Sequence, residues 1–189
     1  FSTAHAAGGQ PNFALQPVLY NPSNSLTKSY FIFDSKPGIV ENSSVRVTNA
    51  GTAAGSVALF PVDATTAQTS GAVYLDQNDP RHDVGNWITL GAHQLTLAPG
   101  QSQVVTFEVT VPATVRPGQH LGGIVAENLT QQQNSTQTQN SKNSGTFQII
   151  VKHLTVIAVQ VNLPGATVEQ LAAAGVQAGG ENGYQRLLL

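Results

Sequence analysis

A two-residue alternation of apolar and polar side chains within Leu97–Pro112 most constrains what this chain can fold into. The apolar members of this stretch fall on every second position and are Val105, Phe107, Val109 and Val111. A period of two places one set of side chains on one face of a β-strand and the intervening set on the other face. One face therefore contacts a core while the other meets water, as in an antiparallel sheet that packs on a second sheet.

Short β-like runs recur along the whole chain and are separated by turns rich in Gly, Pro, Asn and Asp. Helical periodicity is almost absent, and many short strands with regular turn signals are typical of sandwiches and barrels. The sequence therefore predicts an all-β fold, an immunoglobulin-like antiparallel β-sandwich of seven or more strands, with a closed barrel as the alternative. The runs include Phe13–Tyr20, Tyr30–Phe33, Val45–Thr48, Val57–Val62, Val73–Leu75, Trp87–Leu90, Leu95–Val111, Gly122–Ala126 and Phe147–Leu163.

The changes in composition along the chain predict three parts. Residues 1–12 form an N-terminal tail, residues 13–163 form the sandwich domain, and residues 164–189 form a linker and the start of a second, truncated β-domain. Within the sandwich, residues 128–145 are mostly Gln, Asn, Ser and Thr, which cannot bury a core, so we expect a polar, mobile loop there. The β-rich run that follows is too long for one ordinary strand, so a break is expected near Lys152 and His153.

Charge and cysteine content exclude several classes of partner and site. The 189 residues carry a net charge of −2 and no basic run, which argues against a nucleic-acid partner. There is no Cys, so the chain has neither a disulfide nor a thiolate metal site. Ser, Thr, Asn and Gln supply most of the polarity, as is typical of secreted or wall-exposed proteins, and no apolar run approaches the roughly 20 residues that span a bilayer.

No catalytic motif stands out, so we predict a protein that is not an enzyme and needs no cofactor. The chain has no nucleophile elbow, no paired-histidine zinc motif and no phosphate-binding loop. Its five histidines are scattered, and His120, on a predicted strand, is expected to be a hydrogen-bonded structural residue. Another hypothesis is a hydrolase in which this domain is only an accessory to a catalytic part.

The polar stretch Asp76–Asn86 admits a metal-site hypothesis. The carboxylates of Asp76, Asp79 and Asp83 could offer oxygen ligands to calcium, although the spacing of a calcium-binding loop is missing. The alternative is a solvated loop in which Asp and Asn side chains cap turns through backbone N–H groups, and common turn chemistry favours this alternative.

Two aromatic residues beside this stretch also have two interpretations. If Tyr74 and Trp87 are exposed, they could stack on sugar rings, with Arg81, His82 and Asp83 completing the ligand contacts. If Trp87 is buried, it is a core anchor, and the apolar residues that follow it favour burial. These five residues are the candidate ligand-binding residues.

An ordered set of motifs resembles the N-terminal, peptidoglycan-binding-type domain of bacterial WxL-interacting cell-surface proteins. The resemblance covers about residues 13–163, and its most specific element is Leu121-Gly122-Gly123-Ile124. The long Asp76–Asn86 stretch and the Gln/Asn-rich loop have no counterpart in the family pattern. The motifs are Pro37-Gly38, Val45-x-Val47-x-Asn49, Asp63-Ala64, Gly71-x-x-Tyr74, Trp87-Ile88, Leu97-x-Pro99-Gly100-x-Ser102, Phe107-x-Val109-x-Val111-Pro112 and Gly118-x-x-Leu121-Gly122-Gly123-Ile124.

The resemblance implies a secreted protein of Gram-positive bacteria that is associated with the cell wall or cell surface. It implies an immunoglobulin-like domain that binds peptidoglycan or another wall glycan, with a membrane anchor only in a C-terminal part outside this chain. The alternative is an adhesin-like or structural domain that binds another surface protein through loops or an edge strand. An exposed aromatic patch near Trp87 would favour glycan, a long unprotected edge strand would favour a protein partner, and carboxylates clustered in a cleft would favour an enzyme.

Overall fold

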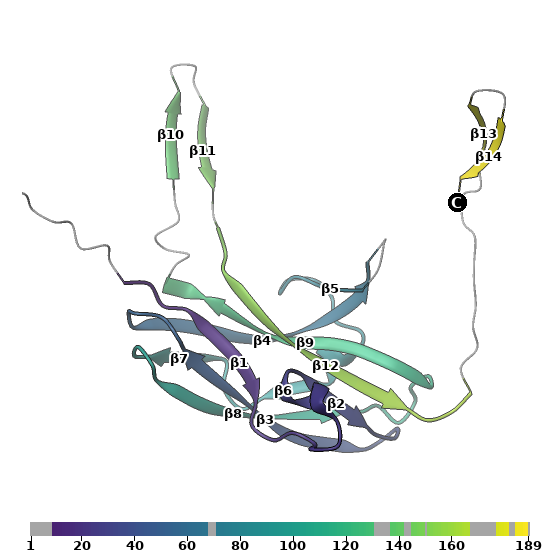
Figure 1. The fold of residues 1–189 in the computed structure, drawn as a ribbon, viewed down its shortest axis with the longest axis horizontal. Coiled ribbons are helices and arrows are strands. Elements are labelled where there is room, and N and C mark those ends of the chain that lie inside the picture. The colour runs from purple at the N-terminus through teal and green to yellow at the C-terminus, as the bar shows by residue number, and fades with distance from the viewer. Residues whose placement is uncertain are drawn as a thin grey trace, which may run out of the picture.

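The computed structural model describes residues 9–67, 71–130, 137–141, 145–149, 151–166, 177–181 and 184–188. Its elements follow one another mostly as strands, and the 3-10 turn η1 and the short helix α1 lie among them (Figure 1). They are β1 (Phe13–Pro17), η1 (Ser25–Lys28), β2 (Phe31–Asp34), β3 (Val40–Asn49), β4 (Gly55–Thr66), β5 (Ala72–Tyr74), α1 (Val84–Trp87), β6 (Ile88–Leu90), β7 (Gln94–Leu97), β8 (Ser102–Thr110), β9 (Gly118–Asn128), β10 (Gln137–Ser141), β11 (Gly145–Ile149), β12 (Leu154–Leu163), β13 (Gln177–Glu181) and β14 (Tyr184–Leu188).

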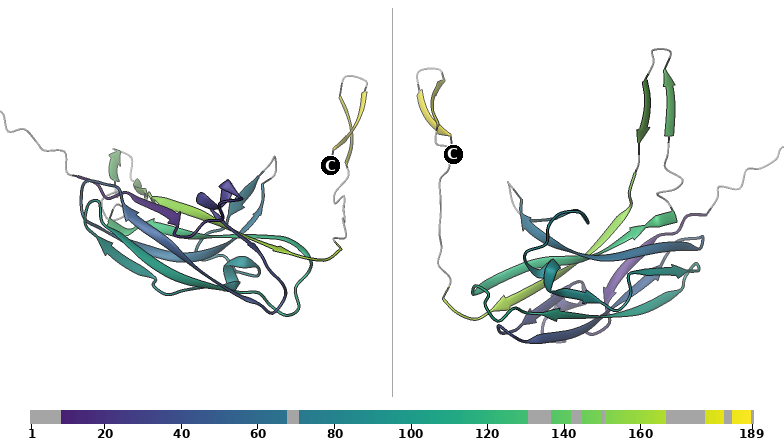
Figure 2. Two further views of the ribbon diagram at one scale, coloured as in Figure 1. Left: turned by 60° about the horizontal axis from the view of Figure 1, so that its bottom comes forward. Right: turned by 180° about the vertical axis from the view of Figure 1, so that it is seen from behind.

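Two sheets pack face to face, which confirms the predicted immunoglobulin-like β-sandwich (Figure 2). The first sheet has four strands in the order β1-β3-β8-β6. The second has the order β2-β12-β9-β4-β5, and β7 pairs with β4 off this path. Strands distant in sequence lie side by side in both sheets, as in other sandwiches with long connections between sheets.

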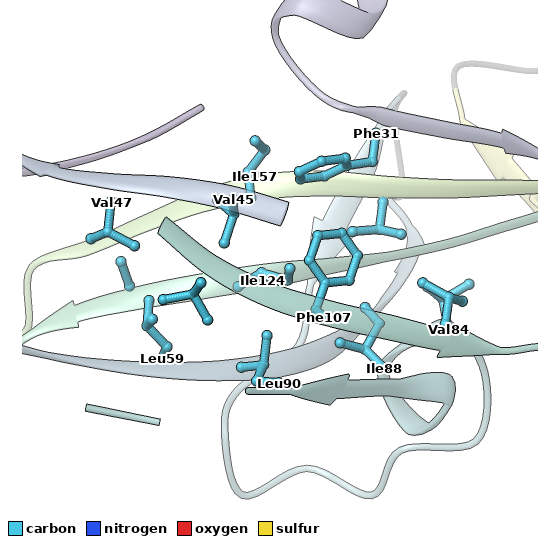
Figure 3. Close-up of a cluster of buried hydrophobic side chains, with 14 of the residues drawn as sticks. Phe31, Val45, Val47, Leu59, Val84, Ile88, Leu90, Phe107, Ile124 and Ile157 are labelled. Carbon is cyan, nitrogen blue, oxygen red and sulfur yellow. The ribbon is translucent and has the colours of Figure 1, made fainter. Parts of the chain in front are cut away.

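The alternation in β8 places its apolar residues in the core. Val105, Phe107 and Val109 are buried, whereas the intervening Thr106 and Glu108 are exposed. The inner faces of both sheets meet around Phe107, whose ring makes an edge contact with Phe31 at 4.8 Å between centroids (Figure 3). Burial of each large apolar side chain here contributes about 1.5–3 kcal/mol, so this shared layer holds the two sheets together.

One strand departs from the predicted antiparallel pattern. β2 runs parallel to β12, with Phe31 opposite Val159 and Phe33 opposite Val161. Such a pairing needs a long connection between the two strands, and here most of the domain lies between them. The sequence run of Tyr30–Phe33 indicated a strand but carried no information on its direction.

The segments outside the sandwich contain further strands. β10 lies within the predicted polar loop and pairs with β11, which begins at the last residue of that loop, and β13 pairs with β14 near the C-terminal end. The expected break before β12 is confirmed, since residues 151–153 belong to no strand. Gln10–Asn12, assigned to the tail by sequence, bond to the sandwich: the backbone N–H of Thr52 donates to the Gln10 carbonyl and that of Ala50 to the Asn12 carbonyl.

The part of the chain that the structure describes has no helix long and apolar enough to cross a membrane.

Candidate functional site

The loop between β5 and α1 is fixed by a buried carboxylate on β4. Asp63 is 5% exposed and accepts three backbone N–H bonds, from His82 at 2.6 Å, Asp83 at 2.9 Å and Gly85 at 2.6 Å. Hydrogen bonds to an ionised acceptor are stronger than neutral ones, and here they satisfy the donors at the start of α1. The polar residues of this loop are therefore held in one conformation by Asp63.

The partly exposed Asp83 pairs with the buried His120 beside Trp87. The Asp83 Oδ1 atom lies 2.7 Å from the Nδ1 atom of His120, which is 3% exposed. The Nε2 atom of His120 lies 3.0 Å from the Arg116 carbonyl oxygen, which can only accept, so Nε2 carries a proton and donates. This histidine has no free nitrogen to serve as a base, so the pair is structural, as the sequence predicted for His120.

Trp87 is a core residue. Its side chain is 5% exposed, and its ring lies 5.0 Å from that of His120. It therefore offers no face to a sugar ring, and the second of the two interpretations, a core anchor, is the one the structure supports. The bend that buries it is α1, a single helical turn that the strand pattern of the sequence did not predict.

The other sequence-predicted residues do not converge on one cleft. Tyr74 is half-buried with Phe60 and Val125 on the outer face of the second sheet, and this burial raises the pKa of its hydroxyl above the usual 10.0. His82 is exposed, and the exposed Arg81 donates to the Pro61 carbonyl at 3.4 Å. The five candidate ligand-binding residues are thus divided between the core and the exposed surface.

The calcium hypothesis is not supported by the geometry of its three carboxylates. Asp79 accepts the backbone N–H of Asp76 at 2.8 Å, and Asp76 accepts that of Asn78, so both cap a turn. Asp83 instead faces His120. Among the described residues no group of three or more His, Asp or Glu side chains could hold a metal ion. The turn-capping alternative describes this loop.

A hollow of about 550 Å³ lies on the outer face of the four-stranded sheet. Its floor is built by register, because Asn42 of β3 lies opposite Glu108 of β8, which in turn lies opposite Thr89 of β6. The next row pairs Ser44 with Thr106. Outward side chains of three neighbouring strands thus form a polar platform, and Leu19, 75% exposed, stands at its side.

A second hollow of about 300 Å³ continues from the first around the edge of β3. The two share Leu19, Asn42 and Ser43 in their linings, and we call them together the Leu19 groove. β1 ends at Pro17, and the Val18 N–H still donates to the Ser44 carbonyl of β3 at 3.1 Å. The next residue, Leu19, is largely exposed. The smaller hollow is lined by aromatic residues, Tyr20 and Tyr30 among them.

The 3-10 turn η1 holds the aromatic end of the groove in place. The buried Thr27 hydroxyl donates to the Asn24 carbonyl at 2.7 Å and accepts the N–H of Asn21 at 2.8 Å. Next to it, the Lys28 ammonium lies over the Tyr20 ring, 5.2 Å from its centroid. This cation–π contact orients an otherwise exposed tyrosine.

The polar side chains of the groove floor are available to a ligand. No side-chain hydrogen bond or ion pair to another described residue involves Asn42, Ser44, Thr89, Thr106 or Glu108. Hydroxyl and amide groups beside apolar and aromatic surface are suited to sugars, which present hydroxyls on their rims and C–H groups on their faces. The arrangement is suited to binding a polar, chain-like ligand.

The sequence did not reveal the groove because its polar residues are the outward half of ordinary alternating strands. Ser, Thr and Asn on a strand's solvent face carry no signal of their own, and their convergence depends on which strands become neighbours. The exposed Leu19-Tyr20 pair, separated from Pro17 by Val18 alone, was a local signal, because two large hydrophobic residues remain outside the core there.

A family model for the WxL Interacting Protein peptidoglycan binding domain matches residues 13–128 of the chain. These residues include most of both sheets and all residues named for the Leu19 groove. No curated protein matches the chain.

Solved structures of low sequence identity also match. The PapD-like domain 7 of human CEP192 is 12% identical, with 88% of this chain and 99% of that chain covered, at a TM-score of 0.43. The E. coli chaperone DraB is 11% identical, with 82% and 56% covered, at a TM-score of 0.46. A family 123 glycoside hydrolase from Clostridium perfringens is 9% identical, with 83% and 28% covered, at a TM-score of 0.45.

Proposed function

Since this chain belongs to the family of the WxL Interacting Protein peptidoglycan binding domain, we propose that it binds peptidoglycan non-covalently in the Leu19 groove. In this role it is a module of the bacterial cell wall or cell surface, on the outside of the cell. The proposal combines the binding named for the family with a site that the family name does not specify.

The observation that carries the choice of site is the open polar platform across β3, β8 and β6. Its larger hollow, about 550 Å³, lies within the roughly 300–1,000 Å³ of ordinary ligand sites. The polar groups on its floor come from sheet strands, which are rigid, so little ordering is needed when a ligand binds. The smaller hollow extends the surface in a way that suits a chain-like ligand.

The same geometry favours binding without catalysis. Asp83 and His120 resemble part of a catalytic triad, but His120 has no free nitrogen to accept a proton from a nucleophile, because its Nε2 atom donates to the Arg116 carbonyl. The groove itself carries a single carboxylate, Glu108, whereas glycoside hydrolysis ordinarily uses a pair.

The sheet edges give less support to a protein partner bound by strand addition. The described edge strands are short, with four residues in each of β2 and β7 and three in each of β5 and β6, and β1 ends in a proline. Short edges and edge prolines discourage pairing with another chain.

Sedimentation of the purified chain with insoluble peptidoglycan tests the proposal. We expect saturable binding by the unchanged chain and at least a tenfold loss in Thr106→Trp, whose indole would fill the larger hollow. Thr110→Trp is the matched control, because Thr110 is an exposed residue of β8 outside the groove lining.

Circular dichroism and thermal unfolding verify that both variants fold. Failure of the unchanged chain to bind would refute peptidoglycan binding. Equal binding by the two tryptophan variants would refute the site.

A further inference from the structure

We infer that the Leu19 groove selects peptidoglycan fragments in which the sugar carries its peptide stem, in preference to the bare sugar chain. The inference rests on the proposed function and goes beyond it by naming the part of the polymer that is read. It follows from two charges of opposite sign: Lys28 lies beside the smaller hollow, over the ring of its lining residue Tyr20, and Glu108 lines the larger hollow. We call these two positions the positive and the negative end.

Lys28 supplies the positive end. Its chain neighbour Thr27 and the ring beneath its ammonium, Tyr20, both line the smaller hollow. The ion pairs among the described residues join His120 to Asp83 and Lys152 to Glu127, so Lys28 has no carboxylate partner there. The cation is held against an aromatic ring and still offers its N–H donors to an incoming anion.

Glu108 supplies the negative end. It is an exposed residue of β8 that lines the larger hollow and does not line the smaller one. Its cross-strand neighbours Asn42 and Thr89 are neutral, and no Lys or Arg lines the larger hollow. This carboxylate is therefore without a counter-charge in the groove, as Lys28 is at the other end.

Such a pair of charges fits a ligand that carries an anion and a cation along one polar chain. The peptide stem of peptidoglycan has carboxylates and, on its diamino acid, a free amine. A polymer of N-acetylglucosamine alone has neither. The hydroxyl and amide groups between the two ends then contact the sugars, while the charges read the stem.

Two soluble probes distinguish these ligands: a purified disaccharide-tetrapeptide released from peptidoglycan, and the neutral N-acetylglucosamine tetramer. Titration calorimetry should show tighter binding of the disaccharide-tetrapeptide. Lys28→Gln should weaken that binding by about threefold to fivefold, the range of an exposed charge pair, and leave the neutral tetramer unaffected. Glu108→Gln should act in the same direction, and added salt should reduce the difference between the probes.

Lys36→Gln is the matched control, since Lys36 is an exposed lysine whose chain neighbours Ser35 and Pro37 line neither hollow. Lys28, by contrast, follows the lining residue Thr27 and lies over the lining residue Tyr20. Equal affinity for the two probes, or equal effects of Lys28→Gln and Lys36→Gln, would overturn the inference while leaving peptidoglycan binding intact. Failure of the unchanged chain to bind insoluble peptidoglycan would instead overturn the proposed function.

Discussion

The loop of residues 76–87 and the Leu19 groove use polar side chains in opposite ways. At the loop, Asp83 bonds to His120 of β9, and Asp63 of β4 accepts three backbone N–H groups of residues 82–85. In the groove, the amide, hydroxyl and carboxylate groups of the floor have no side-chain bonds to described residues. Polar groups that are already satisfied stabilise a conformation, whereas unsatisfied ones on a rigid surface can bind a ligand. We therefore assign a structural role to the loop and propose that the groove binds the ligand.

Removal of the tryptophan gives the largest expected effect. Trp87→Ala should lower the free energy of unfolding by about 3–5 kcal/mol, because it leaves a cavity beside His120 in the core. Chemical denaturation measures this loss. At a temperature where the variant remains folded, its binding to peptidoglycan should equal that of the unchanged chain. Weakened binding by a folded variant would mean that the loop region takes part in recognition.

Asp63→Ala tests whether one buried carboxylate organises the loop. The change leaves three backbone N–H groups without their acceptor, which should cost about 3 kcal/mol of unfolding free energy. Asp79→Ala, which removes an exposed turn cap, should cost less than about 1 kcal/mol. Similar losses in the two variants would contradict the central role of Asp63.

Two asparagines on β3 provide a matched pair. Asn49 is fully buried, and its amide donates to the carbonyls of Ala53 and Leu97 while its oxygen accepts from Asn12 and Gly51. Asn49→Ala should therefore cost about 2–3 kcal/mol, and Asn42→Ala less than about 0.5 kcal/mol. Urea unfolding of both variants measures the difference. A substantial stability loss in Asn42→Ala would show that this groove residue is already engaged in structure.

The raised pKa of the Tyr74 hydroxyl predicts a smaller effect, a pH dependence of the free energy of unfolding. Burial raises its pKa, so the folded state holds the proton more tightly than the unfolded state. The stabilisation is fully present below the unfolded pKa near 10 and is lost as pH rises through the folded pKa. The stability of the unchanged chain should thus fall more steeply between pH 9 and 11 than that of Tyr74→Phe. Parallel pH profiles would contradict this prediction.

How far the sequence predicted the structure depends on the range of the interaction. Alternation in β8 predicted which residues form the core, because a period of two is a local property. The Gly122-Gly123 pair in β9 leaves no room for side chains, since a Cβ at Gly122 would lie 2.8 Å from the Val62 carbonyl oxygen and one at Gly123 3.0 Å from the Tyr74 ring. The parallel pairing of β2 with β12 was not predictable, since it joins segments more than a hundred residues apart.

The candidate site was harder to predict for the same reason. The carboxylates of Asp76–Asp83 suggested a calcium site, yet Asp63, about twenty residues earlier, accepts the backbone N–H groups of His82 and Asp83 and fixes this stretch in the structure. The groove depends on three strands becoming neighbours, which sequence patterns do not specify. Trp87 had two interpretations in the sequence, and its burial required the turn at α1.

The most direct test of the account compares substitutions in the two regions on insoluble peptidoglycan. One double variant, Asn42→Ala/Thr106→Ala, removes floor groups of the groove, and the other, Arg81→Ala/His82→Ala, removes exposed side chains of the loop. With both variants folded by circular dichroism, the groove variant should bind at least fivefold more weakly and the loop variant should bind as the unchanged chain does. Loss of binding in the loop variant with binding retained in the groove variant would contradict the assignment of recognition to the Leu19 groove.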